Sequence, residues 1–452
     1  MTLLNLIKSS LLVIAKSTLS PKLALLKELG NFKFSIVFGV LAGICYLVYN
    51  AISDYEFIRK NIGDVEYDIT LKAYSHVSQN PTNAPRIIVV MIDEKYLRDH
   101  NLSNGNETLG FNYTPRSLLA NILNKLDTKI AGQKPKGVLL DYYLAYSGDI
   151  NGTVTADDKT LIDAINAHAK EYPIYIPTYT NKMFIQPYLN KSVKFASVQV
   201  DQNKDGIIRG YSPYLCKDDK KIAHIAKIFS LTNNNENSEC DASYKPSFDE
   251  MLNSRILFKR IDDVAKVSNY KNITIYQAGE LDNIDEDFND AIVLIGSDYK
   301  NSGDIINTTI DTRSGVLILA DTITTASILS NGLRKVHPLI AAMSYALMFF
   351  IITWTALSLM DKFNVKNDTV KTNILLISNI LIFFIPASGM MFAGYYLSWA
   401  VPMILFEATD KLMIIAKAKN KIDTLAKPIL ITIAVTLAII VLVIVATIAT
   451  IL

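Results

Sequence analysis

The feature that most constrains this chain is residues 34–52, a run that contains no charged side chain. A run of this length can cross a bilayer as a single helix. Similar apolar runs follow the polar middle of the chain, at about residues 339–360, 372–391, 397–416 and 428–452. The sequence therefore predicts one membrane helix before a polar region and about four after it. Gly39 and Gly43 form a GxxxG pattern in the first span, which is either a dimer face or an ordinary pair of span glycines.

Basic residues indicate how these spans are oriented. Residues 1–33 are amphipathic and rich in lysine, as expected of a segment on the cytoplasmic surface. Lysines cluster again in 362–371 and in 417–427, on the same side of an alternating path. No cleavage site with small residues follows 34–52, so this span is predicted to remain as an anchor. The polar region 53–336 is then outside the cytoplasm and is long enough to bury its own core.

The predicted organisation has six parts. They are a basic cytoplasmic segment, an anchor, an extracytoplasmic domain, three membrane helices, a basic cytoplasmic linker and a last membrane helix. Their residues are 1–33, 34–52, 53–336, 337–416, 417–427 and 428–452 respectively.

Charge and cysteine content limit the class of function. A formal net charge of +2, with lysines gathered beside apolar spans, argues against nucleic-acid binding. The three cysteines form no CxxC pair, so zinc-finger and thioredoxin-like sites have no support. Cys216 and Cys240 lie in the polar region and could form a disulfide in an oxidising compartment. Spacing alone leaves the bonded and the free states open.

Three apolar runs in the polar region end in carboxylates, at residues 87–94, 137–141 and 291–298. Such runs are typical of buried parallel strands, and helical patterns at 115–126, 157–170 and 314–331 alternate with them. The fold class predicted is therefore α/β, with a largely parallel sheet. Residues 173–178 contain two prolines and are expected at a sheet edge. A helical pattern near 55–69, which includes Val65 and Ile69, is expected to continue from the membrane.

The carboxylates Asp93, Glu94, Asp141 and Asp298 are expected at the carboxyl edge of this sheet, where α/β folds bind ligands. Arg116 lies in the first turn of the helix after the first strand, where it could meet an anionic group. The same residues could instead form a structural ion pair between strand and helix. A third interpretation is a metal-dependent hydrolase that uses Asp93 and Asp141.

Residues 201–206 match the first half of a calcium-binding loop. Asp201, Asn203 and Asp205 would supply the alternating oxygen ligands, and glycine follows at the sixth position. The ninth position is Arg209 and the twelfth is a serine rather than a glutamate, which would weaken a metal site. The same residue types also suit a tight hairpin turn, so both interpretations stay open.

Several segments together resemble the second type of cyclase- and histidine-kinase-associated extracellular sensor domain, the CHASE type 2 domain. They are VVMIDEKYL, YTPRSLLANIL, PKGVLLDYYL, DDKTLIDAI, DQNKDGIIRG, IVLIGSDY and SGVLILADTITTASILSNG, in this order between residues 89 and 332. The resemblance covers about residues 55–336, and three spans follow the domain, as they usually do in this family.

The resemblance implies a bacterial inner-membrane protein whose periplasmic domain senses a signal and passes it to a cytoplasmic cyclase or kinase. Leu319 and Ala320 stand where the family often has His-Ala. A lysine-rich linker and a fifth span occupy the place of the output domain. We therefore expect a non-enzymatic sensor, without a cofactor, that acts as a homodimer or through a separate membrane or cytoplasmic signalling protein. The alternative is a structural or adaptor subunit of an envelope complex.

Overall fold

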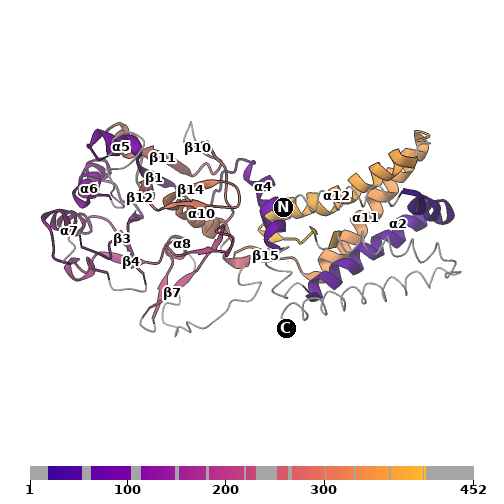
Figure 1. Cartoon of the computed structure of the whole chain (residues 1–452), viewed down its shortest axis with the longest axis horizontal. Coiled ribbons are helices and arrows are strands. Elements are labelled where there is room, and N and C mark those ends of the chain that lie inside the picture. The colour runs from indigo at the N-terminus through magenta and orange to yellow at the C-terminus, as the bar shows by residue number, and fades with distance from the viewer. Residues whose placement is uncertain are drawn as a thin grey trace. The chain divides into compact units, whose positions relative to one another are not determined.

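The computed structural model describes residues 19–52, 63–102, 114–147, 152–179, 183–217, 220–230, 252–262, 267–300, 302–329, 332–365, 368–400 and 402–403. The chain divides into two compact units, Leu71–Arg334 and the pair Met1–Thr70 with Lys335–Leu452. Figure 1 shows the elements of each unit along the chain.

The unit Leu71–Arg334 contains an eight-stranded sheet in the order β4-β3-β2-β12-β1-β11-β10-β9. Six of its strands are parallel neighbours, and the short β10 and β9 add an antiparallel edge. The strands are β1 (Ile87–Asp93), β2 (Gly137–Leu140), β3 (Ile174–Pro177), β4 (Lys194–Ala196), β9 (Ile261–Asp262), β10 (Val267–Ser268), β11 (Ile273–Gln277) and β12 (Ile292–Asp298). The predicted α/β class and parallel sheet are confirmed.

Helices cover both faces of this sheet (Figure 1). One layer contains α5 (Glu94–Asp99), α6 (Arg116–Ile130), α7 (Ala156–His168) and η3 (Ala278–Asn283). Its side chains pack with alternate strand residues such as Val90, Val138 and Val293 in one core. On the other face, α10 (Gly315–Ile328) packs against β1 and β12 and contacts α8 (Ile225–Phe229). Both faces are thus buried, which explains why the strands read as continuous apolar runs.

Smaller elements differ from the prediction in instructive ways. Residues 173–178 do form a strand, but β3 lies inside the sheet between β2 and β4. Pro177 is tolerated there because it is the last residue of β3, and the next amide, of Thr178, bonds to Ala196 O at 2.9 Å. The remaining strands form antiparallel pairs: β5 (Val200–Gln202) with β6 (Ile208–Tyr211), β7 (Tyr214–Lys217) with β8 (Lys220–Ala223), and β13 (Ile305–Asn307) with β14 (Thr312–Ser314).

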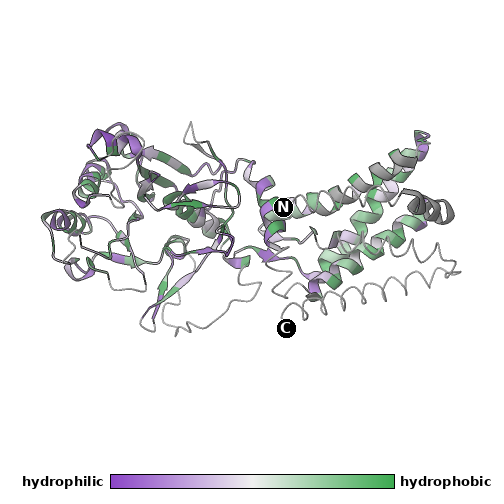
Figure 2. Cartoon of the chain, in the orientation of Figure 1, coloured by the Kyte–Doolittle hydropathy of each residue, from purple (hydrophilic) through white to green (hydrophobic). Residues whose placement is uncertain are grey.

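In the other unit, α2 (Leu19–Ile52) changes direction at Gly30, which has a φ of 71°. Two helices of the described residues are long and apolar enough to cross a membrane, Gly30–Ala51 and Pro338–Lys362, the latter being α11. A further helix, α12 (Asp368–Phe392), covers the second predicted carboxyl-terminal span. Figure 2 shows hydrophobic residues along α2, α11 and α12. Most of 397–416, and all of 417–427 and 428–452, lie outside the described residues.

The glycines of the GxxxG pattern face α11 of the same chain. A Cβ atom on Gly39 would lie 2.5 Å from Ala346 O, and one on Gly43 would lie 3.0 Å from Ala342 O. Small residues let the two helix backbones approach this closely. This glycine face therefore packs within the chain, and dimerisation through it would require α11 to be displaced.

The helix α4 (Asp64–Ser75) lies in the region where a helix was predicted to continue from the membrane. Its buried apolar residues are Tyr67, Leu71 and Tyr74, whereas Val65 and Ile69 of the predicted stripe are half-buried. The predicted stripe missed this buried face because two of its apolar residues are tyrosines and because the acidic Glu66 is buried with them.

Candidate functional site

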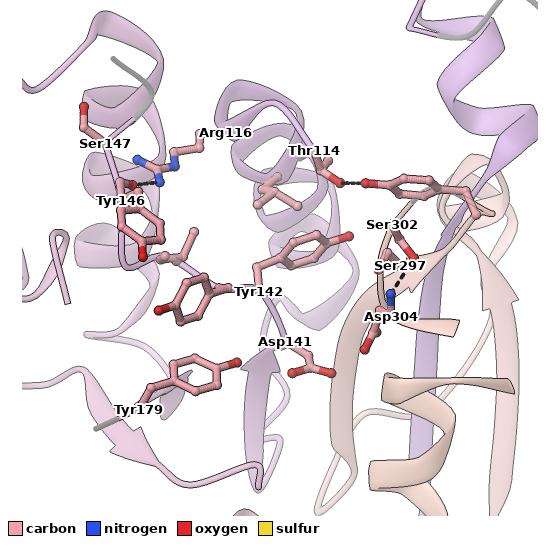
Figure 3. Close-up of a pocket in the computed structure, with 15 residues that line it drawn as sticks. Thr114, Arg116, Asp141, Tyr142, Tyr146, Ser147, Tyr179, Ser297, Ser302 and Asp304 are labelled. Carbon is pink, nitrogen blue, oxygen red and sulfur yellow. Dashed lines mark hydrogen bonds between the residues drawn. The ribbon is translucent and has the colours of Figure 1, made fainter. Parts of the chain in front are cut away.

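A cavity of about 450 Å³ opens at the carboxyl edge of the sheet, beyond the ends of β2 and β12. Figure 3 shows carboxylates, tyrosines and serines around it. Its lining residues come from the start of α6, the segment after β2, the end of β3 and the segment between β12 and β13. This is the edge at which the sequence predicted a ligand site, and the volume is that of a small-molecule site.

Two carboxylates, those of Asp141 and Asp304, line this cavity near one another (Figure 3). Asp141 is the first residue after β2, and its main-chain N–H donates to Ile295 O at 2.8 Å. Asp304 precedes β13, and its carbonyl oxygen accepts from the N–H of Gly315 at 2.9 Å. A Cβ atom on Gly315 would collide with the Asp304 carboxylate, so the first residue of α10 leaves room for that group.

Both carboxylates are held in surroundings that disfavour their charge. Burial raises the pKa of Asp141 well above its usual range, and the neighbouring charge of Asp304 adds to the rise. Burial also raises the pKa of Asp304 to about 7, and the charge of Asp298 adds to this effect while the Gly315 N–H opposes it. Desolvation and like charge act in the same direction here. The cavity therefore favours either a proton or a cationic group beside these carboxylates.

Tyrosines make up much of the remaining wall. The ring of Tyr143 lies 4.5 Å from that of Tyr179 and 5.6 Å from that of Tyr146, in edge-to-face geometry. The hydroxyl of Tyr299 is 3.1 Å from Thr114 Oγ1. The hydroxyl of Tyr142 is buried and forms no hydrogen bond of normal geometry with the described residues.

Arg116 lines the same cavity, but its charge is already engaged (Figure 3). Its guanidinium donates to the buried carboxylate of Asp158 and to Tyr146 O. The main-chain N–H groups at the start of α6 donate to Asp157, at 2.8 Å from Arg116 and 2.9 Å from Ser117. This geometry favours the structural ion pair over anion binding, although the pair joins two helices rather than strand and helix. The N-cap of α6 is Pro115, so Thr114 lies one residue before the cap position.

The other predicted ligand residues lie at the same sheet edge but not among the residues that line the cavity. Asp93 and Asp298 are register partners at the ends of β1 and β12. The Asp93 side chain caps α5 by accepting from Tyr96 N at 2.8 Å, and Glu94 is the first residue of that helix. Asp304 and the tyrosines of the cavity were not predicted from the sequence. The run DYYLAY at 141–146, directly after a buried strand, was the signal available for the tyrosines.

The residues of the calcium-like loop stabilise the β5–β6 hairpin. Asp205 forms an ion pair with Arg209, with Oδ2 at 2.8 Å from Nη2, and Asp201 Oδ1 accepts from Ser212 Oγ at 2.6 Å. Asn203 O accepts from the N–H of Gly206 at 2.9 Å, as in a tight turn. These contacts favour the turn over the metal site. No group of three or more His, Cys, Asp or Glu side chains suited to a metal ion occurs in the described ranges.

Cys216 lies in β7 and takes part in a disulfide bond. Cys240, its predicted partner, lies outside the described residues, so the pairing itself stays a prediction. Cys45, in α2, is buried and forms no disulfide bond.

The fold and the site define a class: an α/β domain with a cavity at its sheet edge, in a chain with helices apolar enough to cross a membrane. Within that class, the chain belongs to the CHASE2 domain family, which matches residues 46–360. This family consists of extracellular sensor domains. No curated protein and no solved structure matches the chain.

Proposed function

We propose that this protein is a sensor module of a bacterial inner membrane. Its α/β domain, in the periplasm, binds a small molecule in the cavity and relays the event through its membrane helices to a separate effector. The observation that carries this proposal is the open cavity of about 450 Å³, whose two half-buried carboxylates have no cation paired with them among the residues that the structure describes. We also propose that the chain is not an enzyme.

One end of α4 is suited to the relay because it is fixed within the domain. Lys259 Nζ donates to Tyr74 O at 2.7 Å and to Val77 O at 2.8 Å, and Asn269 Nδ2 donates to Ser75 O at 3.0 Å. These bonds satisfy carbonyl groups at the carboxyl end of a helix, where a cation is also favoured by the helix dipole. A movement of the domain core at Lys259 is therefore transmitted to α4.

The earlier part of α4 belongs to the other unit, which contains α2, α11 and α12, and is fixed there. Glu66 is fully buried and accepts from Ser398 Oγ at 2.8 Å and from the N–H of Trp399. Trp399 Nε1 in turn donates to Thr70 Oγ1 at 2.9 Å. These contacts join α4 to the segment after α12. The same helix thus has anchored residues in each unit, which supports it as the path of the relay.

A spin-label distance measurement tests the relay. The full-length protein in nanodiscs would carry labels at Val40→Cys in α2 and Leu347→Cys in α11, both exposed. It would be measured with and without compounds from a panel of amines, amino acids, sugars and organic acids that shift its thermal unfolding. A binding compound is expected to change the distance distribution. A label pair within one helical layer, Asn121→Cys and Asp163→Cys, serves as the control.

Identical α2–α11 distributions with and without bound compound would contradict the relay. The alternative is a structural or adaptor subunit. A cavity filled with large side chains would favour that alternative, whereas the cavity here is open. Co-purification from native membranes separates the two. A stoichiometric cyclase, kinase or regulator supports the sensor, whereas envelope structural proteins alone support the adaptor.

A further inference from the structure

The cavity offers hydrogen-bond acceptors and negative charge, and no described lining residue supplies a free cation to balance them. Arg116 is the basic side chain among its lining residues, and Asp158 with Tyr146 O already takes its donors. An anionic ligand would therefore meet Asp141 and Asp304 and find no free positive partner among the lining residues that the structure describes. The like charge and the desolvation of these carboxylates would instead be relieved by a bound cation.

The tyrosine rings on one wall of the cavity also favour a cationic ligand, independently of the carboxylates. The rings of Tyr143, Tyr146 and Tyr179 form one edge-to-face cluster, and Tyr143 and Tyr146 are exposed by 44% and 68% at the cavity. Faces of aromatic rings attract organic cations. The buried hydroxyl of Tyr142 adds an oxygen that makes no hydrogen bond of normal geometry with the described residues and can accept one from a ligand N–H.

We infer that this cavity binds an organic cation, an ammonium or guanidinium group held between Asp141 and Asp304 against the tyrosine wall. The inference rests on the proposed function, since it assigns a ligand class to the same sensing site.

A bare metal ion fits the cavity less well than an organic cation does. The lining supplies two carboxylates, and among the residues described no third His, Cys, Asp or Glu joins them as a metal-binding group. A volume of about 450 Å³ is much larger than one ion requires and suits a small organic molecule. The exposed tyrosines would then cover the carbon chain of an aliphatic amine.

The protonation of the site gives the binding a direction with pH. Asp304, with a pKa of about 7, and Asp141, whose pKa is also raised, must lose protons to pair with a cation. The other charged side chains near these two carboxylates are Asp298, which lies near Asp304, and Glu94, which lies near Tyr299. Arg116 is paired with Asp158. Binding of an amine that stays protonated is therefore expected to tighten as pH rises from 6 to 8.

Calorimetric titration of the full-length protein in nanodiscs tests the inference. The probes are putrescine, spermidine, agmatine and L-arginine, with 1,4-butanediol and succinate as neutral and anionic analogues. At least one amine is expected to bind, and Asp141→Asn or Asp304→Asn to weaken it by about tenfold or more, the loss of a charge-assisted pair. Asp163→Asn, on the exposed side of α7, is the matched control and should leave affinity unchanged.

Each outcome decides between the two proposals. Amine binding that is unchanged in both cavity variants, or no binding of any amine at millimolar concentration, overturns the cation inference. Binding of butanediol or succinate that is lost in Ser302→Trp, which fills the cavity, overturns the ligand class but keeps the cavity as a sensing site. Both cavity variants remove charge without changing shape, and their thermal unfolding curves verify that they fold.

Discussion

Two regions of the α/β domain hold desolvated carboxylates, and they differ in the cations that lie beside these carboxylates. In the α10 region, Asp321 is fully buried and Arg313 forms ion pairs with both Asp321 and Asp311. At the cavity, Asp141 and Asp304 are half-buried beside one another, and no described residue supplies such a cation. Burial raises the pKa of Asp321 too, although Arg313 opposes that rise. A raised pKa alone thus does not mark a binding site; our proposal for the cavity rests instead on its open volume and on the lack of a paired cation among the described residues.

The largest effect is expected from removing the cation that pairs with Asp321, since the α10 region would then resemble the cavity. Arg313→Met leaves Asp321 buried beside Asp311 without its cation and removes a bond to Lys259 O. We expect a loss of about 3–5 kcal/mol in the free energy of unfolding. Thermal unfolding of the full-length protein in nanodiscs measures it. Arg86→Met, which breaks a half-exposed pair with Glu286, is the control and should lose about 1 kcal/mol or less.

A smaller loss is expected from crowding the cavity carboxylate. Gly315→Ala places a methyl group against the Asp304 side chain, whose carboxylate oxygens leave no room for it. We expect about 1–3 kcal/mol of destabilisation by overpacking, together with weaker ligand binding because the carboxylate must move. Gly389→Ala, whose added Cβ would meet no atom within 4 Å, should not destabilise the protein. Equal effects of the two substitutions would contradict the close packing at Asp304.

Removing the charge of the cavity carboxylate should stabilise the protein, whereas breaking the ion pair should destabilise it. Asp304→Asn removes a charge that burial and Asp298 disfavour, so unfolding at pH 8 is expected to become harder by about 1 kcal/mol. The same variant should lose amine binding. Such a gain of stability with loss of binding is typical of functional sites. A destabilised Asp304→Asn at pH 8 would instead place Asp304 among the structural carboxylates.

The pH dependence of stability follows from the same groups. Between the unfolded pKa of about 4 and the folded pKa of about 7, the native Asp304 holds more proton than the unfolded one. Stability contributed by this group is therefore present at low pH and is lost as pH rises through 7. The difference in unfolding free energy between pH 5 and pH 8 should be smaller in Asp304→Asn than in the original protein.

The smallest effect is expected at Glu66, which is buried among neutral donors rather than cations. Burial raises its pKa to about 7, while the bonds from Ser398 and Trp399 oppose the rise. Glu66→Gln resembles the protonated form, so at pH 6 stability should change by about 0.5 kcal/mol or less. A large loss at pH 6, measured by thermal unfolding, would show that the charged carboxylate holds this contact.

The class of fold could be predicted because strands buried on both faces must be apolar throughout, as 87–92 and 291–296 are. The sheet edge could be predicted because Asp93, Asp141 and Asp298 end such runs. The role of Asp304 could not be predicted, since this residue lies in an irregular segment with no periodicity. Asp158, the partner of Arg116, is distant in sequence and is brought close only by the packing of α6 on α7.

The position of β12 has a consequence for how the domain can be made. β12 lies between β1 and β2 and pairs with both, yet about 150 residues separate it from β2 along the chain. As the chain grows from its amino terminus, the two earlier strands have no direct pairing to bring them together. A fragment that ends before residue 292 lacks the strand that joins them. Sheet assembly thus depends on distant contacts, the condition under which folding is slow.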